Sequence, residues 1–445
     1  MFVSSIPVYA ATALQKLNDS GFEVYLVGGC VRDMLLGSVP HDWDITTNAL
    51  PEQIIGAFED FTVIPTGLKH GTVTVLIAKE PIEITTYRID GDYSDNRRPD
   101  SVSFTRNLKE DLARRDFTIN ALAMDADGNI VDYFGGTEDI KIGIIRCVGN
   151  ATNRFTEDAL RILRALRFAA VLGFWIDTET KKAICSEAQR LHNISAERIN
   201  VELTKLLCGR NAVNILREYA EIVAVVIPEI KPLFGFNQQN PHHIYDAWEH
   251  TLQVVANTPP EPVLRWAALL HDIGKPQAFS ASEDGIGHFY GHAKFSIEIA
   301  DEIMVRLKFD NASRNRIKTL IEWHDLAIRP AKATVKRRLN RLGTETLSQL
   351  FKLQRADNLA HAPKDVYKQK TIDNLESIMA EIIAENECFF LRDLAVNGND
   401  MLALGFSGKA VGDILDELLN TVIDGKLPNE REILLDEAKK RFQND

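Results

Sequence analysis

The chain has 445 residues, of which 45% are hydrophobic and 26% are charged. At roughly 150 residues per domain this length predicts about three domains, and the composition excludes a disordered, collagen-like or disulfide-scaffold chain. The formal net charge of −12 excludes a globally positive surface, so any contact with nucleic acid must use local basic patches. The five cysteines form no C-x-x-C pair, and neither a signal sequence nor a membrane-length apolar run is present. We therefore expect a soluble cytoplasmic protein without structural zinc and without a membrane partner.

The predicted elements of the N-terminal third alternate between helix and strand. Residues 7–19 have helical spacing that stops at Gly21, and residues 23–27 then form a buried strand pattern. Further strand patterns cover 42–46, 72–78 and 82–88, and a helical pattern covers 50–61. These patterns predict an α/β head with a mixed sheet.

The remainder of the chain is almost wholly helical in pattern. The Pro- and Asn-bearing stretch 231–243 is the clearest candidate linker. The fold class is therefore α+β, with an α/β head followed by an all-α body. Helices are expected at 157–173, 195–207, 263–274, 294–307 and 346–360.

A glycine pair follows the strand pattern at 23–27. Gly28 and Gly29 precede a short helix that contains Arg32 and Asp33, and a helix start of this kind can hold a phosphate through its backbone amides. A glycine turn without a ligand remains the alternative.

Two aspartates form the first candidate metal site. Asp42 and Asp44 are two residues apart in a strand pattern, so both carboxylates point to the same side. Such a pair can hold two metal ions for phosphoryl or nucleotidyl transfer. Glu83 lies on a later strand that we expect beside them and is a candidate third carboxylate. Its alternative is a solvent-facing strand residue.

Four motifs carry a family resemblance. Residues 26–33 (LVGGCVRD) with 42–44 (DWD), 114–121 (RRDFTINA), 132–136 (DYFGG) and 157–161 (EDALR) occur in this order. Together they resemble the class II tRNA nucleotidyltransferase and bacterial poly(A) polymerase branch of the nucleotidyltransferase superfamily. The resemblance implies that 114–121 recognises ribose, that 132–136 joins head to neck, and that 157–161 is a template for the incoming base. It also implies catalysis by Asp42, Asp44 and Glu83 with Mg²⁺, and nucleotide contacts from Gly28, Gly29, Arg32, Asp33, Arg115, Asp116 and Asn120.

The template is also chemically reasonable. If 157–170 is one helix, Asp158 and Arg161 lie on the same edge of it. The carboxylate can then accept a hydrogen bond from cytosine or adenine, and the guanidinium can donate one to the same base. Uracil and guanine are disfavoured there. Arg164 and Arg167 continue the basic edge toward nucleotide and RNA phosphates, whereas 195–199 resembles a helix-stabilising element that we take as structural. A helix salt bridge is the alternative.

A polar, charged stretch at 89–104 predicts a mobile loop. In the family, a loop at this place with acidic and basic residues accompanies the switch from cytosine to adenine addition, and Asp95, Arg97 and Arg98 provide them here. The loop argues against an enzyme that adds only cytosines. A charged surface loop without a role is the alternative.

A second set of candidate metal ligands lies in the helical body. Its order H…HD…H…H…D resembles the HD phosphohydrolase superfamily and supplies enough nitrogen and oxygen ligands for two divalent ions such as Ni²⁺, Co²⁺ or Mn²⁺. The resemblance implies hydrolysis of phosphoesters, including 2′,3′-cyclic phosphates. Scattered surface or core histidines are the alternative, and His242, His243, His288 and His361 match no position. The predicted ligands are His250, His271, Asp272, His292, His324 and Asp357.

The C-terminal stretch 394–412 also resembles tRNA nucleotidyltransferases. Gly408 and Gly412 flank a helix start, so Gly408 and Lys409 are candidate RNA-binding residues. Close helix packing at the two glycines is the alternative.

These observations predict four segments: a nucleotidyltransferase head (1–140), a helical neck with the template (141–235), an HD domain (236–365) and a tRNA-binding tail (366–445). We expect an enzyme that adds C, C and A to tRNA 3′ ends from CTP and ATP. The alternatives are an enzyme that adds only the terminal A, a bacterial poly(A) polymerase, an HD phosphohydrolase with an RNA-binding head, and a non-catalytic RNA-binding protein. The intact aspartate pair and the acidic net charge favour the first. The oligomeric state stays open.

Overall fold

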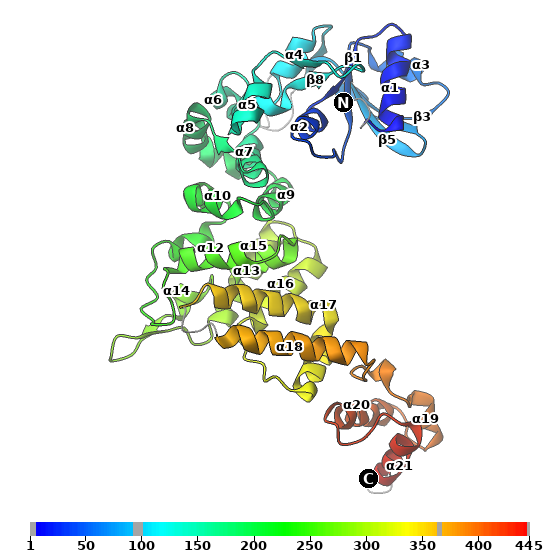
Figure 1. Cartoon of the computed structure of the whole chain (residues 1–445), viewed down its shortest axis with the longest axis vertical. Coiled ribbons are helices and arrows are strands. Elements are labelled where there is room, and N and C mark those ends of the chain that lie inside the picture. Colours follow the sequence, from blue (N-terminus) through cyan, green and yellow to red (C-terminus); the bar gives the residue numbers. More distant parts are fainter. Residues whose placement is uncertain (1–5, 92–100, 363–366, 443–445) are drawn as a thin grey trace. The chain divides into compact units, whose positions relative to one another are not determined.

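The computed structural model describes residues 6–91, 101–362 and 367–442, and Figure 1 shows the course of the chain. The chain divides into two compact units, residues 1–228 and 229–445. This division lies a few residues before the boundary between the predicted neck and HD segments. Asp95, Arg97 and Arg98 of the predicted loop lie outside the described residues.

A seven-stranded sheet forms the head of unit 1, in the order β3-β4-β5-β2-β1-β8-β9. All neighbours are antiparallel except β2 and β5, which are parallel. The expected strands are present, whereas β3, β8 and β9 carry no pattern strong enough to predict. The strands are β1 (Val24–Val27), β2 (Asp44–Thr47), β3 (Thr62–Gly67), β4 (Thr72–Ile77), β5 (Glu80–Thr86), β8 (Leu122–Met124) and β9 (Ile130–Asp132), and a separate hairpin comprises β6 (Arg88–Asp90) and β7 (Val102–Phe104).

Hydrophobic periodicity explains how the head packs. Helix α1 buries Ala10, Ala13, Leu14 and Leu17, which recur at the spacing of one helix face, and it packs against β1, β4 and β5. Strand β4 alternates buried and partly buried residues, as a half-covered strand does. The helices of the head are α1 (Val8–Asp19), α2 (Gly29–Leu35), α3 (Pro51–Ala57), α4 (Leu108–Ala113) and α5 (Gly136–Ile142).

Asp132 organises the predicted junction between head and neck. Its carboxylate accepts hydrogen bonds from the backbone amides of Phe134, Gly135, Gly136 and Thr137 at 2.9–3.1 Å. Gly135 has φ +78°, and a Cβ on Gly136 would lie 2.1 Å from the carbonyl oxygen of Thr118. Only glycine fits this approach, so the turn into α5 is fixed by its sequence.

We expect Asp132→Ala to lower the free energy of unfolding by about 1–3 kcal/mol, because four amides lose their acceptor at the start of a helix. Asp132→Asn keeps one acceptor oxygen and should lose less. Thermal melting of the three proteins measures the difference, and equal melting temperatures for Asp132→Ala and wild type would contradict this role.

Helices make up the remainder of unit 1, together with the two-residue parallel strands β10 (Ile144–Ile145) and β11 (Trp175–Ile176). The predicted continuous helix 157–170 is wrong. The chain leaves helical geometry at Asp158, where φ is −142° and ψ is 101°, because the Asp158 side chain accepts from the amide of Leu160 and caps the next helix. The helices are α6 (Ala151–Glu157), α7 (Leu160–Leu172), α8 (Thr178–Glu187), α9 (Ala196–Leu207), α10 (Ala212–Glu218) and α11 (Ala220–Val226).

In the described part of unit 2, the regular structure is helical apart from one short hairpin, β12 (Ser280–Ala281) with β13 (Gly287–His288). The long helix α17 is interrupted at Gly343, whose φ of 75° and ψ of 165° are not helical. Helices α17 and α18 lie side by side (Figure 1). The helices are α12 (Ala247–Asn257), α13 (Pro262–Leu270), α14 (Lys275–Ala278), α15 (His292–Arg306), α16 (Asn311–Trp323), α17 (Lys332–Leu359) and α18 (Tyr367–Ala384).

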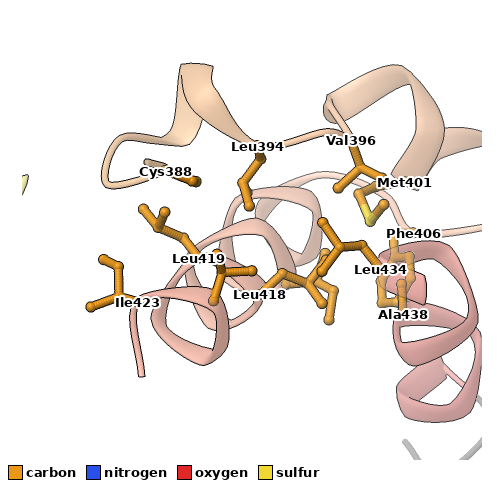
Figure 2. Close-up of a cluster of buried hydrophobic side chains, with 12 residues drawn as sticks. Cys388, Leu394, Val396, Met401, Phe406, Leu418, Leu419, Ile423, Leu434 and Ala438 are labelled. Atoms are coloured by element: carbon orange, nitrogen blue, oxygen red, sulfur yellow. The ribbon is translucent and has the colours of Figure 1, made fainter. Parts of the chain in front are cut away.

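The C-terminal segment has its own hydrophobic cluster, shown in Figure 2. Met401, Leu418 and Leu434 are fully buried at its centre, and they come from three different helices. These helices are α19 (Gly398–Ala403), α20 (Lys409–Ile423) and α21 (Arg431–Phe442).

Candidate functional site

Two neighbouring parallel strands bring the predicted carboxylates together. Asp44 on β2 pairs in register with Glu83 on β5, which confirms the expected neighbourhood of these strands. Strand β2 begins at Asp44, so Asp42 lies just before it. Asp42 and Asp44 are both exposed on either side of buried Trp43, as residues on one side of an extended chain are. The pKa of Asp44 is raised because the protein removes part of its water, and Glu83 and Asp42 add to this rise while Arg115 opposes it.

Gly28 and Arg115 lie beside these carboxylates. Gly28 precedes α2 with φ +80°, and a Cβ there would lie 2.8 Å from Nη1 of Arg115. Burial lowers the pKa of Arg115, against the opposing effects of Asp111 and Asp44. Its Nε is buried and has no hydrogen-bond partner among the described residues. A buried donor of this kind is a natural site for an anionic ligand, because leaving it unpaired costs free energy.

A continuous polar network joins two of the predicted motifs, 26–33 and 114–121, to helix α7. Arg32 of α2 donates to Asp33 at 2.9 Å and to Asn120 at 2.6 Å. Asn120 in turn donates to Asp116 at 3.1 Å, and Arg164 of α7 donates to Asp116 at 2.8 Å. Burial alone would raise the pKa of Asp116, but Arg164 and Asn120 hold it well below its usual range. Asp116 therefore stays ionised and ties the template helix to the head.

Phe168 lies at the centre of three guanidinium groups. The Cζ atoms of Arg167, Arg32 and Arg164 lie 4.0, 5.0 and 5.4 Å from the centre of its ring. Arg167 also pairs with Glu202 at 3.1 Å, and burial lowers its pKa to about 10. The ring holds these like charges together through cation–π contacts.

The predicted template pair has different partners from those expected. Asp158 accepts from Arg198 at 2.7 Å, whereas Arg161 donates to Glu157 at 2.5 Å and to the backbone carbonyl of Arg114 at 3.1 Å. Arg198 belongs to the segment 195–199, which we interpret as structural. No local signal identifies it, since it lies 40 residues from its partner.

The six predicted ligands of unit 2 converge at one place. His250 Nε2 lies 3.0 Å from Asp357 and 3.3 Å from Asp272, and His271 Nε2 lies 3.1 Å from Asp272. On the other side of Asp272, the Nε2 atoms of His292 and His324 lie 3.3 and 3.7 Å from its Oδ1. Asp272 is thus shared by two groups of ligand atoms, each compact enough for one ion.

The orientation of the imidazoles is that of metal ligands. Nδ1 of His271, His292 and His324 lies 2.8, 2.9 and 2.7 Å from a backbone carbonyl oxygen, and Nδ1 of His250 lies 3.4 Å from another. A proton on Nδ1 leaves Nε2 as the lone-pair nitrogen facing the centre. Nε2 of His250 and of His271 is buried without a hydrogen bond of good geometry among the described residues.

The charges in this cluster are strongly coupled. Burial alone would raise the pKa of Asp272, but His271 and Lys275 hold it well below its usual range. Burial opposes charge on His271, but Asp272 and Asp357 prevail and raise its pKa to about 10. Lys275 Nζ lies 2.6 Å from Asp272 and donates to Gln238 at 2.8 Å.

A cavity of about 290 Å³ opens onto this cluster, and its lining includes Asp272, His292 and Asp357. His243, His288 and His361, which match no position of the predicted ligand order, also line it. Sequence order could not place them, because His243 and His361 are brought against His250 only by the packing of the linker and the end of α17.

The tail residues lie at the start of α20. Gly408 has φ +56°, and Lys409 is 91% exposed with its Nζ 4.0 Å from Asp413. A Cβ on Gly408 or Gly412 would meet nothing within 4 Å, so close helix packing does not explain either glycine.

Paired carboxylates on a mixed sheet that leads into a helical neck suit a nucleotidyltransferase, and the family models show a polymerase-type head. Residues 24–146 match the family described as "Poly A polymerase head domain", and residues 173–234 match "Probable RNA and SrmB- binding site of polymerase A". Residues 277–438 match a family described as domain 2 of tRNA nucleotidyltransferases.

Relatives that align over the whole chain identify the family within this class of nucleotidyltransferases. The chain is 34% identical to the CCA-adding enzyme of Leuconostoc mesenteroides over 100% of both proteins, and 36% identical to that of Lactobacillus johnsonii over 96% of this chain and 95% of that protein. The crystal structure of the Bacillus stearothermophilus CCA-adding enzyme in complex with CTP is 32% identical, with a TM-score of 0.72 over 98% of this chain and 97% of that one. The chain therefore belongs to the CCA-adding enzyme family.

As a member of this family the chain is a nucleotidyltransferase, a class that normally requires a divalent metal ion. This assignment excludes the alternative of a non-catalytic RNA-binding protein. No helix among the described residues has the length and apolar character needed to cross a membrane.

Proposed function

We propose that this chain adds C, C and A to tRNA 3′ ends from CTP and ATP in the cytoplasm. The observation that supports it best is the register of Asp44 with Glu83, next to Asp42 and to Arg115 with its unpartnered Nε. This arrangement supports the proposal because carboxylates lie beside a buried donor in a chain that aligns over its whole length with a CCA-adding enzyme.

The proposed metal ligands are Asp42 and Asp44, with Glu83 as a third carboxylate. An all-oxygen ligand set suits Mg²⁺, which when bound would activate the attacking hydroxyl and neutralise the triphosphate. Arg115 donates to the triphosphate, and the amides after Gly28 and Gly29 are further donors to it. Asp116 and Asn120 hold Arg164 and Arg32 in place for the nucleotide.

Asp158 and Arg161 remain the proposed base-reading pair, and Arg198 orients the Asp158 carboxylate. The four predicted segments keep their proposed roles as head, neck, HD domain and tail. Arg167, Gly408 and Lys409 remain proposed RNA contacts.

Stepwise addition distinguishes this function from its closest alternative. The enzyme would be incubated with tRNA lacking CCA, tRNA ending in C and tRNA ending in CC, with CTP and ATP supplied separately and together. We expect CTP to extend the first two and ATP to extend the third. Extension of the third tRNA alone would indicate an enzyme that adds only the terminal A.

Asp158→Ala should weaken base choice more than it weakens triphosphate binding. A well-formed hydrogen-bonded pair contributes about 1–3 kcal/mol of discrimination, so incorporation of UTP and GTP relative to CTP and ATP should rise roughly tenfold to hundredfold. Relative kcat/KM values for the four nucleotides measure this effect. An Asp158→Ala enzyme that rejects UTP and GTP as wild type does would remove Asp158 from the template.

A second activity is favoured by the convergence of four imidazole Nε2 atoms on Asp272 and Asp357. We propose that this HD-type site holds Ni²⁺, Co²⁺ or Mn²⁺, because mixed imidazole and carboxylate ligands suit such ions. The six ligands would hold these ions, which when bound would activate water for the hydrolysis of phosphoesters, with a 2′,3′-cyclic phosphate at an RNA end as the proposed substrate. Cleavage of the bond to the 3′ oxygen would leave a 2′-phosphate and free the 3′ hydroxyl that the head extends.

Metal binding to this site should strengthen as pH rises. With its pKa raised to about 10, His271 carries a proton at neutral pH that a metal ion must displace. Because the pKa of His292 is raised as well, at least one proton is lost on binding, and the affinity for Co²⁺ should rise at least about tenfold per pH unit between roughly pH 6.5 and 8.5. Calorimetry in buffers of different ionisation enthalpy measures the released proton. An affinity that is independent of pH would contradict this charge assignment.

A further inference from the structure

Two arginines of α17 share one aromatic ring in unit 2. The Cζ atoms of Arg338 and Arg341 lie 4.2 and 4.6 Å from the centre of the Trp323 ring. Trp323 is the last residue of α16 and is 4% exposed. Because residues three apart on a helix lie on the same face, both guanidinium groups belong to one surface of α17.

These arginines differ from the other cations of their segment. Residues 332–341 contain five basic residues and no acidic residue. Lys332, Lys336 and Arg337 pair with Glu385, Glu387 and Asp424, respectively. Neither Arg338 nor Arg341 forms an ion pair within residues 6–91, 101–362 and 367–442, and Nε of Arg338 is buried there without a hydrogen-bond partner.

The two positive charges are also close enough to oppose one another. Burial, followed by repulsion from Arg341, lowers the pKa of Arg338. Cation–π contacts with Trp323 offset part of this repulsion, but they leave the hydrogen-bonding edges of the guanidinium groups without an anion. The pair is therefore a site of uncompensated positive charge in a chain of net charge −12.

A hollow of about 520 Å³ lies next to the pair. Arg341 lines it from α17, facing Asn315, Arg316 and Thr319 of α16, and Glu322 is the acidic residue in the lining. Arg316 is itself paired with Glu345 at 3.1 Å. This lining is open and rich in hydrogen-bond donors, which suits a solvated chain of phosphates better than an apolar small molecule.

We propose that Arg338 and Arg341 bind the phosphodiester backbone of the tRNA. The proposal rests on the proposed function, since tRNA is the polyanion that such an enzyme holds. A guanidinium group can donate two parallel hydrogen bonds to two phosphate oxygens. Trp323 holds both guanidinium groups on one surface in the absence of RNA, so the site is preorganised. An acidic chain needs local basic sites of this kind to bind RNA at all.

The test is equilibrium binding of tRNA lacking CCA to the full-length double variant Arg338→Gln, Arg341→Gln, over about 50 to 300 mM KCl. Each lost phosphate contact should reduce the slope of log K against log salt by roughly 0.7–0.9, so the double variant should lose between one and two units of slope. We expect affinity near 0.1 M salt to fall about tenfold or more. The kcat and the KM for CTP and ATP at saturating tRNA should match wild type.

Arg337→Gln is the matched control, because Arg337 is the adjacent residue and its charge is already paired with Asp424. Thermal melting checks the fold, and the single variant Arg341→Gln repeats the measurement at an exposed position if the double variant is unstable. Unchanged affinity and slope, or an equal loss in Arg337→Gln, would overturn the proposal. If the wild-type enzyme extends tRNA and the double variant binds tRNA as wild type does, the role of Arg338 and Arg341 is contradicted and the proposed function is unaffected. A wild-type chain that neither binds nor extends tRNA would overturn both.

Discussion

Asp42→Ala and Asp44→Ala should each lower nucleotide addition at least about 1,000-fold while tRNA binding survives, because these carboxylates are the proposed ligands of the catalytic metal. Asp44 pairs in register with Glu83, and Asp42 lies next to them. Removing either aspartate therefore leaves too few carboxylate oxygens to hold two ions. Single-turnover addition of CTP to tRNA lacking CCA measures the loss, and tRNA binding is measured on the same preparations.

Glu80→Ala is the matched control for this pair. Glu80 is an exposed carboxylate at the start of β5, three residues before Glu83, and it pairs with Ile77 instead of with β2. Its removal changes the net charge equally and should leave addition near the wild-type rate. Full activity in Asp42→Ala or Asp44→Ala would remove the two-metal assignment, and a parallel loss of tRNA binding would indicate misfolding.

Asp272→Ala should abolish metal-stimulated hydrolysis of a 2′,3′-cyclic phosphate and leave CCA addition nearly unchanged. Asp272 is the one ligand shared by both groups of ligand atoms in unit 2, so its loss removes a ligand from both proposed ions. The proposed Mg²⁺ ligands lie in unit 1, which is a separate compact unit. Hydrolysis and addition would be assayed on one preparation across Mg²⁺, Mn²⁺, Co²⁺ and Ni²⁺.

His242→Ala controls for the loss of an imidazole near this site, because His242 is exposed and does not line the cavity. It should hydrolyse the cyclic phosphate as wild type does. Absence of hydrolysis by wild type with every ion would make the cluster structural, and loss of CCA addition in a folded Asp272→Ala protein would show that the two sites are coupled.

Most strands of the head sheet can be predicted from the sequence because their hydrophobic patterns are local. Alternation of apolar residues marks β4. The expectation that Glu83 is a third carboxylate beside Asp42 and Asp44 agrees with the register of Asp44 with Glu83. The order of the predicted ligands His250 to Asp357, which matches the HD pattern, likewise anticipated their convergence. The relative positions of residues in short motifs are therefore well predicted here.

The template region shows what such patterns miss. A helical pattern runs through Asp158, yet its side chain bonds the amide of Leu160 and Arg198 instead, and the backbone leaves helical geometry there. Whether the Asp158 side chain bonds locally or the helix continues depends on Arg198, which lies 40 residues away. Hydrophobic periodicity does not reveal such a partner. His243 and His361 were missed for the same reason, because only tertiary packing places them against His250.

Sequencing of the product 3′ ends tests the central claim most directly. The enzyme would be given tRNA lacking CCA together with CTP, ATP, GTP and UTP in excess, and the extended ends would be read at completion. We predict that nearly all products end in a single CCA with no further nucleotides. Long runs of A, as a poly(A) polymerase makes, or ends of mixed sequence would contradict the assignment of this chain to CCA addition.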